Sequence, residues 1–548
     1  MTDEATKKGT DSTRRSFVGG AAALAGTVAA GGMPALAPAP AMAQGRKKHP
    51  KRGGTMRFGT RDDSIALDTH RNIIYFVSHP LTGVTGGLVD FDDKMQPKPG
   101  VAESWDASSD LMTWTFKLRR GAEYHNAQTI DAESVKWNIE RIKDPKISHA
   151  FTRSVVADVD RVTVDDKHTV RFHLKEPHAA LDINLIYYPV NLMAPGAVDT
   201  ADTHPVNCGP FKFKSWRRLD ICELVRFENF WETDSEGNSL PYLDALIGRP
   251  KKEDRVRLTA LRTGELDLID NVAYADAPAF KKDHGRTFDT WNVPQVGTAM
   301  MFFNLKNGLL SENDNPDAHL LLQAIAHAID HEGIHQAVFN GIGEISKGFY
   351  SSASPWHSKD IEGWPKFDPD KAKALRKKAK GGDEKFTIIA NDTFPYMQQS
   401  GELVHAMLKD AGFNAVLEIL PSPVMLEKQN KGEYHIDSTA NSYRLDPDGW
   451  YGRNILSTAP ENRRRIGYKN DKADQIILAA RRERDRAKRR LMYADVETLV
   501  NKDLPMLYTH FVPLMMAGNK NRVKGFNVSY SGPWSYAGAG MRRAWIEG

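Results

Sequence analysis

The segment 386–419 constrains the fold most strongly. It contains a short apolar run, a helical pattern that ends at Ala411, and a second short apolar run. Two parallel strands joined by one helix need helices packed on the sheet, so this unit indicates an α/β protein. Strand and helix patterns also alternate in the first half, from the alternating strand at 55–61 to the strand at 266–269. We therefore predict two α/β lobes and an extra unit at about 87–203.

Other elements follow from local signals. The pattern predicts strands at Thr113 to Leu118, Gly297 to Leu305 and Leu504 to Phe511. Asp131 is placed to cap a helix that runs through Arg141, and 162–174 has the pattern of a hairpin.

The first 43 residues have the pattern of an export signal. Arg14 and Arg15 precede an apolar run rich in alanine and glycine, and 41–43 (Ala-Met-Ala) offers a cleavage site. The arginine pair followed by Ser-Phe-Val resembles a twin-arginine signal. A membrane anchor is the alternative, but the apolar run is short, glycine-rich and interrupted by proline. We predict a signal peptide over 1–43, a flexible basic tail over 44–53 and a periplasmic location.

The charge balance argues against a nucleic-acid partner. The 548 residues hold 74 basic and 70 acidic side chains, a formal excess of only +4. Nucleic-acid-binding domains usually carry a larger basic excess gathered on one face. The densest basic run, at 481–490, contains acidic residues and no aromatic ones, which is typical of a solvated helix face. We expect no nucleic-acid partner.

The two cysteines, Cys208 and Cys222, flank a predicted hairpin. With 217–220 as its turn, Cys222 faces Ser215, seven residues from Cys208. At the rise of a strand the two thiols would lie about 20 Å apart, too far for a disulfide. We predict two unpaired thiols.

A series of short motifs follows in order along the chain. The motifs are PGVAESWDASSDLMTWTFKLRRGAEYHNAQTIDAESVKW, NCGPFKFKSW, GELDLID, HLLLQAIAHAIDHEGIHQAVFNGIG, FDPDKAKALRKKA, LDPDGW and DLPMLY. Each is weak alone, but their order and spacing resemble the family 5 extracellular solute-binding proteins of ABC importers. This is the dipeptide, oligopeptide and nickel-binding family, and the resemblance covers nearly all of the mature chain.

The resemblance implies an α/β type II periplasmic-binding-protein fold, with two lobes, a hinge and an additional α+β domain. It also implies a monomeric receptor, not an enzyme, that holds a small-molecule solute between its lobes and delivers it to an ABC permease in the inner membrane. No cofactor or metal is expected. The implied boundaries are 54–86, 204–292 and 505–548 for a discontinuous lobe I, 87–203 for the additional domain and 293–504 for lobe II.

An alternative function comes from a literal H-E-x-x-H motif. His331 and His335 on one helix face would bind zinc, and Glu332 would act as general base in a secreted zinc-dependent hydrolase. Gly333 weakens the helix, and no third ligand follows at the usual spacing. Asp330 is placed instead to cap a second helix within 317–340, which we favour.

The solute site is expected near Asp446-Pro447-Asp448. The resemblance implies that peptide-binding members hold the ligand's ammonium with an aspartate three residues before this element. Tyr443 stands there instead, and a neutral phenol lacks the charge for such a bond. Arg444 and Arg453 suit an anionic group, unless they pair with Asp446 and Asp448 on the surface. Both possibilities remain open.

Aromatic residues on two segments offer further ligand contacts through stacking. The full predicted ligand-binding set is Tyr443, Arg444, Asp446, Trp450, Tyr451, Arg453, Phe394 and Tyr396. The expected solute is peptide-like or anionic, such as a modified amino acid, an opine-like compound or a sugar conjugate.

Overall fold

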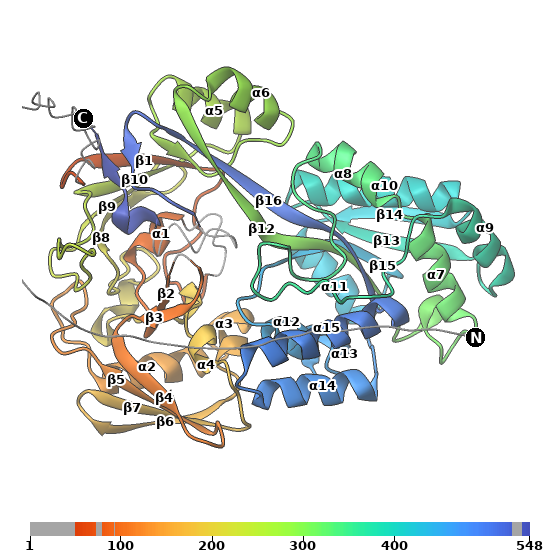
Figure 1. Ribbon diagram of the computed structural model, residues 1–548, viewed down its shortest axis with the longest axis horizontal. Helices are drawn as coiled ribbons and strands as arrows, with labels where there is room; N and C mark the ends of the chain where they lie inside the picture. Colours follow the sequence, from red (N-terminus) through yellow and green to blue (C-terminus); the bar gives the residue numbers. More distant parts are fainter. Residues whose placement is uncertain (1–49, 73–78, 93, 529–539, 548) are drawn as a thin grey trace, which may run out of the picture. The chain divides into compact units, whose positions relative to one another are not determined.

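The computed structural model describes residues 50–72, 79–92, 94–528 and 540–547 (Figure 1). The predicted signal peptide and most of the predicted basic tail lie outside the described residues. No helix within the described ranges is long and apolar enough to cross a membrane.

A ten-stranded sheet dominates the structure, in the order β14-β13-β15-β12-β16-β11-β1-β10-β9-β8. One side, named here the β1 half, contains β1 (Thr55–Thr60), β8 (Phe211–Arg217), β9 (Ile221–Arg226), β10 (Ala245–Pro250) and β11 (Leu268–Ile269). The other, the β13 half, contains β13 (Lys385–Asn391), β14 (Asn414–Leu420) and β15 (Ile436–Ser442). Two long strands, β12 (Phe288–Phe303) and β16 (Met506–Asn519), run side by side through both halves (Figure 1).

The pairing of β12 with β16 is interrupted where the halves meet. The ladder skips from Val293, opposite Leu514, to Gly297, opposite Val512. Each strand has a proline at this point, Pro294 and Pro513. Proline has no N–H to donate to a ladder, which explains the break.

Strand directions make the two halves face each other. In the β1 half, β11 runs antiparallel to β16 and therefore in the direction of β12, and β1 is parallel to β11. In the β13 half, β15 runs antiparallel to β12, and β13 is parallel to β15. The carboxyl ends of both sets of strands therefore point toward the break. Such ends are the usual place for ligands in α/β proteins.

The strand–helix–strand unit predicted at 386–419 is confirmed. It consists of β13, α10 (Pro395–Asp410) and β14, with the two strands parallel. The predicted two-part helix is confirmed as α7 (Ala318–Ala328) and α8 (His331–Phe339). The Asp330 carboxylate accepts a hydrogen bond from the Gly333 N–H at 2.9 Å and caps α8.

A separate four-stranded antiparallel sheet has the order β4-β5-β7-β6. Its strands are β4 (Ala102–Ala107), β5 (Thr113–Leu118), β6 (Val159–Asp166) and β7 (Thr169–Leu174). The helix α2 (Ala132–Lys143) packs on it and begins with a capping box between Asp131 and Ser134. The predicted strand, hairpin and helix start in this region are therefore confirmed.

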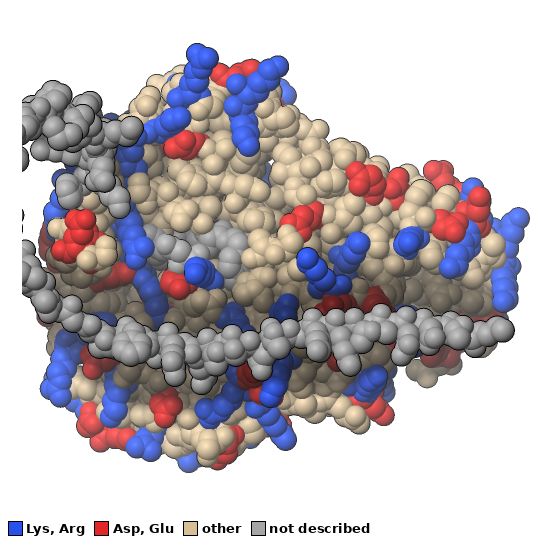
Figure 2. Space-filling model, viewed as in Figure 1, with Lys and Arg blue, Asp and Glu red and all other residues tan. Residues whose placement is uncertain are grey.

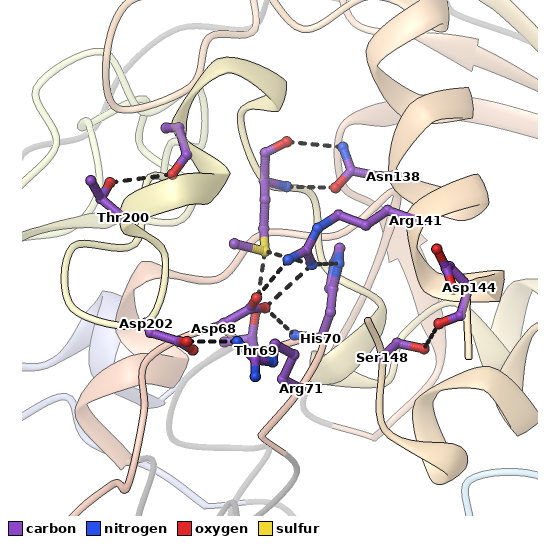
Figure 3. Close-up of polar contacts among 12 residues, drawn as sticks. Asp68, Thr69, His70, Arg71, Asn138, Arg141, Asp144, Ser148, Thr200 and Asp202 are labelled. Atoms are coloured by element: carbon purple, nitrogen blue, oxygen red, sulfur yellow. Dashed lines mark hydrogen bonds and ion pairs between the residues drawn. The ribbon is translucent and has the colours of Figure 1, made fainter. Parts of the chain in front are cut away.

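The loop that follows β1 binds α2 through a buried cluster of polar side chains (Figure 3). Asp68 pairs with Arg141 at 2.6 Å, and Arg141 also donates to Nδ1 of His70 at 2.8 Å. The other ring nitrogen of His70 donates to the Asn191 carbonyl at 2.9 Å. Burial lowers the pKa of His70 to about 4, so the ring stays neutral and the cluster keeps one arrangement.

Both cysteines are buried and free, which confirms the predicted unpaired thiols. The predicted hairpin register is wrong by one residue, because Cys222 pairs with Trp216 and Ser215 pairs with Glu223. The turn contains three residues, not four, since Arg217 already pairs with Ile221 and Leu219 adopts a left-handed conformation (φ 62°).

The remaining elements cover the sheets or connect them (Figure 1). The α-helices are α1 (His79–Val84), α3 (Ala150–Val155), α4 (Leu181–Asn184), α5 (Asp254–Arg262), α6 (Ala277–His284), α9 (Pro369–Lys378), α11 (Ser422–Lys431), α12 (Asp448–Asn454), α13 (Pro460–Arg465), α14 (Asp471–Arg482), α15 (Arg486–Asp503) and α16 (Met541–Arg543). The short strands are β2 (Val89–Phe91), β3 (Pro97–Pro99), β17 (Val523–Lys524) and β18 (Trp545–Ile546), and the 3-10 turns are η1 (Tyr188–Val190), η2 (Pro195–Thr200) and η3 (Gly308–Leu310).

Charged side chains of both signs are mixed over the face shown in Figure 2. This mixing agrees with the small net charge of the sequence.

Candidate functional site

A cavity of about 310 Å³ lies at the break between the two halves of the sheet. Residues that follow carboxyl ends of strands form much of its wall, as the topology requires. They are Arg61 after β1, Asp270 and Asn271 after β11, and Phe394 and Tyr396 after β13. Val296 and Pro513, from the interrupted part of β12 and β16, also line it. Two predicted site residues, Phe394 and Tyr396, therefore border this cavity.

Arg61 and Phe394 meet across the break. The guanidinium carbon of Arg61 lies 5.0 Å from the centre of the Phe394 ring, and that ring stacks on Tyr396 at 5.7 Å. An Arg61 N–H also donates to the Thr393 carbonyl at 3.4 Å.

A buried ion pair lies under Arg61. The Arg257 guanidinium is 3.0 Å from the Asp270 carboxylate, and both side chains are enclosed. The other oxygen of Asp270 accepts the backbone N–H of Arg61 at 2.8 Å. Burial raises the pKa of Asp270, opposed by the charge of Arg257. The negative charge of Asp270 is thus matched by Arg257.

Tyr443 supports the cavity wall from behind. Its backbone N–H donates to the Val296 carbonyl at 3.0 Å, and Val296 lines the cavity. Its side chain is completely buried, with the hydroxyl 2.8 Å from Oγ of Ser354. The ring meets Tyr350 edge to face at 5.5 Å.

Arg444 and Arg453 both contact the ring of Phe151, from α3. Their guanidinium carbons lie 5.0 and 5.6 Å from the ring centre. Arg453 is 3.5 Å from the Glu461 carboxylate, whereas among the described residues Arg444 donates to backbone carbonyls, that of Ser442 at 3.1 Å. Burial and the nearby charge of Arg444 lower the pKa of Arg453 to about 10.

The alternative partners of these arginines are already engaged. Both oxygens of Asp446 bind Arg489, at 2.7 and 2.8 Å. Asp448 accepts from Nε of Arg481 at 2.7 Å. Within the described part of the chain, neither Arg444 nor Arg453 pairs with these aspartates, so the surface-pairing alternative is wrong.

The other predicted site residues lie in the core beside this cluster. Trp450 is fully buried, stacks on Phe349 at 4.0 Å and donates to the Tyr508 hydroxyl at 3.0 Å. Tyr451 is also buried and hydrogen-bonds to Glu497. The structure therefore buries Trp450, Tyr451 and Asp446 in contacts within the chain, and their direct contact with a solute stays a prediction.

The H-E-x-x-H motif does not gather its histidines around one point. His331 packs against Trp364 at 4.4 Å, and burial lowers its pKa to about 3. His335 instead meets His510, with 2.7 Å between ring nitrogens. These histidines belong to no metal-binding group found among the described residues.

One group of described residues, Asp158, His178 and Asp448, has ligand atoms close enough to hold an ion. Its hydrogen bonds do not suit a metal. Nδ1 of His178 accepts the N–H of Ala180 at 3.2 Å, so the proton is on Nε2, which points to Asp448 at 3.3 Å. Arg481 already binds the same carboxylate. We interpret the group as a hydrogen-bond network that links His178, within 87–203, to α12.

Sequence reasoning missed Arg61 and Phe151. Arg61 appeared only as the last residue of a predicted strand, although the carboxyl end of a strand is itself a signal for a ligand site. Phe151 carried no sequence signal, because its role depends on two arginines about 300 positions away, at 444 and 453.

Comparisons with known proteins identify the family and the fold. The chain belongs to the bacterial extracellular solute-binding proteins, family 5, whose model matches residues 96–463. It is 25% identical over 469 residues to the glutathione-binding protein GsiB of Pectobacterium atrosepticum, covering 81% of this chain and 85% of the relative.

Solved structures share the fold. The binding protein AgaA in complex with agropinic acid, from A. tumefaciens R10, has a TM-score of 0.77 at 23% identity, covering 90% of this chain and 99% of that one. The binding protein DppA from Helicobacter pylori in complex with the peptide STSA also has a TM-score of 0.77, at 20% identity, covering 91% and 99%. The predicted family and α/β periplasmic-binding fold are confirmed, and the chain is a solute-binding protein of ABC importers, not an enzyme.

Proposed function

We propose that the chain is a periplasmic receptor that captures an anionic small solute at the break between the β1 and β13 halves. It then delivers the solute to an ABC permease in the inner membrane. Candidate solutes are modified amino acids, opine-like compounds and sugar conjugates. A peptide-like solute fits if it carries an acid group.

The pair Arg444 and Arg453 carries this proposal. The two guanidinium groups share one phenyl ring, and among the described residues only Glu461 forms an ion pair with either of them. Like charges held together in a partly desolvated place are costly unless an anion joins them. Tyr443, which stands where an ammonium-binding aspartate would be, adds no negative charge.

Two known ligands support an acidic solute. GsiB is a glutathione-binding protein, and the AgaA structure contains agropinic acid. Both ligands are acids. They show that related binding proteins accept acidic solutes.

The proposed closing motion uses the boundaries given above. Lobe I comprises 54–86, 204–292 and 505–548, lobe II comprises 293–504, and 87–203 forms the additional domain. The broken ladder of β12 and β16 would act as the hinge, because a short unpaired stretch absorbs rotation easily. We further propose export of a monomer by the twin-arginine route, with cleavage after residue 43.

Substitution of Arg444 tests the proposal. A thermal-shift screen over peptides, opine-like conjugates and metal chelates finds the best solute, and calorimetric titration measures its affinity. Arg444→Gln should weaken binding of an acidic solute about tenfold or more, because a hydrogen bond between charged groups is lost. Arg463→Gln, on the exposed face of α13, is the matched control and should bind normally. Equal affinity for both variants would contradict the proposal.

A further inference from the structure

We infer that the solute carries two acid groups and that Arg61 binds the second of them from the cavity wall. This inference rests on the proposed function and assigns a substrate class to it. The class is small diacids in which a compact organic body separates two carboxylate or phosphate groups.

The hydrogen-bonding capacity of Arg61 is largely unused. Its guanidinium carbon lies 5.0 Å over the Phe394 ring, and one N–H makes a 3.4 Å contact with the Thr393 carbonyl. The only carboxylate that pairs with its side chain among the described residues is Asp62, at 3.7 Å, and that carboxylate is 45% exposed. Exposed pairs of this kind are weak. Arg61 therefore offers a fork of N–H donors to an anion in the cavity.

The other charged side chains on the cavity wall pair with one another. Arg257 pairs with Asp270 at 3.0 Å and also with Asp254. With Arg61 included, the wall holds two basic and two acidic side chains and no net charge. Among the described residues neither of these carboxylates pairs with the Arg61 guanidinium, so an anionic group is favoured next to Arg61 over an ammonium group.

Arg444 repeats the same arrangement at the end of another strand. Arg61 follows the carboxyl end of β1 and rests on a phenyl ring, whereas Arg444 lies two residues beyond β15 and rests on Phe151. Strands β1 and β15 point toward the break from opposite sides. The two cationic positions therefore lie at strand ends on opposite sides of the break, Arg61 on the cavity wall and Arg444 beyond it. The Tyr443 backbone joins them, since it binds Val296 on the cavity wall.

The volume fits a small diacid. A cavity of about 310 Å³ is at the lower end of the range for ligand pockets, which excludes a long peptide from the cavity itself. Its wall includes Val338, Val512 and Leu514, which suit the carbon skeleton between the two acids. Opine-like conjugates and short γ-glutamyl peptides have this composition.

Matched pairs of solutes test the inference. The probes are glutathione beside its monoethyl ester, and N-(1-carboxyethyl) derivatives of arginine, glutamine and lysine beside the parent amino acids. Each is titrated into the mature protein by calorimetry. At least one diacid should bind, and at least tenfold more tightly than its partner with one acid fewer. In Arg61→Gln the ratio of the diacid's affinity to that of its partner should fall to about one, while Arg61→Lys should restore part of this ratio.

Arg262→Gln is the matched control. Arg262 also rests on a phenyl ring, that of Phe280, at 5.7 Å, but it lies exposed on α5 and does not line the cavity. This variant should keep the full ratio. Binding of a diacid and its partner with equal affinity, or an unchanged ratio in Arg61→Gln, would overturn the inference and leave the receptor function standing. If no probe binds, the diacid class is overturned. Absence of any bound solute in protein from its native host would overturn the receptor function too.

Discussion

Glu497 is an acid enclosed among aromatic rings. Its carboxylate receives a hydrogen bond from the hydroxyl of Tyr451, and the Phe349 backbone N–H lies 3.5 Å from it. Burial raises the pKa of Glu497 to about 7, although these hydrogen bonds oppose the shift. The network shares α12 with the arginine cluster, because this helix contains both Tyr451 and Arg453.

The stability of the protein should therefore depend on Glu497 between pH 5 and pH 8. A folded pKa of about 7, above the unfolded value of 4.5, means that the folded chain keeps a proton which the unfolded chain releases. The stabilisation is full below pH 4.5 and is lost as pH rises through 7, by about 3 kcal/mol at most. In Glu497→Gln the free energy of unfolding, from urea titrations, should vary less over this interval.

Glu427→Gln is the control for this experiment, since Glu427 is exposed and forms an ion pair with Lys431 on the same helix, α11. It should retain the pH dependence of the parent protein. If Glu497→Gln shows the same pH dependence as the parent protein, Glu497 is already charged at pH 5 in the folded chain, which would contradict the prediction.

Single residues show where sequence reasoning stops. Tyr443 stands three residues before Asp446-Pro447-Asp448, and that no aspartate holds an ammonium there stays a prediction. Trp450 and Tyr451 were predicted as stacking surfaces, but both rings are buried. Their partners, Phe349 and Glu497, are distant in sequence, and a helix pattern does not reveal which neighbour covers which face.

The helix α8 shows how one element accounts for a motif that resembled a zinc site. Asp330 caps the helix, and Gly333 is the residue whose N–H it binds. A Cβ at Gly333 would lie 2.7 Å from the Asp330 carboxylate, so the cap explains the glycine that weakens the motif.

Removal of this cap should cost stability without affecting solute binding. Asp330→Ala is expected to lower the free energy of unfolding by about 1 kcal/mol, because the Gly333 N–H loses its partner. Glu253→Ala is the control, since Glu253 precedes α5 without a capping hydrogen bond. Chemical denaturation of both variants measures the difference. Equal stability, or a loss of affinity in Asp330→Ala alone, would contradict this role.

Elements with a strong local pattern could be predicted, whereas their full length could not. The unit β13-α10-β14 has its own apolar runs and was predicted closely. The strand predicted from Gly297 actually begins at Phe288. Pro294 interrupts the strand pattern in the sequence, whereas in the structure β12 pairs with β16 on both sides of the break.

The whole molecule brings together residues that are far apart in the chain. Arg61 and Phe394 meet at one cavity because the strands that precede them end at the same break. The family and fold class could be predicted from ordered motifs. The cavity could not, because it depends on strand order in a sheet built from discontinuous segments.

Native mass spectrometry of the mature protein, purified from its own host, tests the central claim most directly. The account predicts one small acidic molecule bound per chain, identified after release by its mass and fragments. The double variant Arg61→Gln with Arg444→Gln should lose it, while Arg262→Gln with Arg463→Gln should keep it. A neutral or cationic solute retained equally by both double variants would contradict the account.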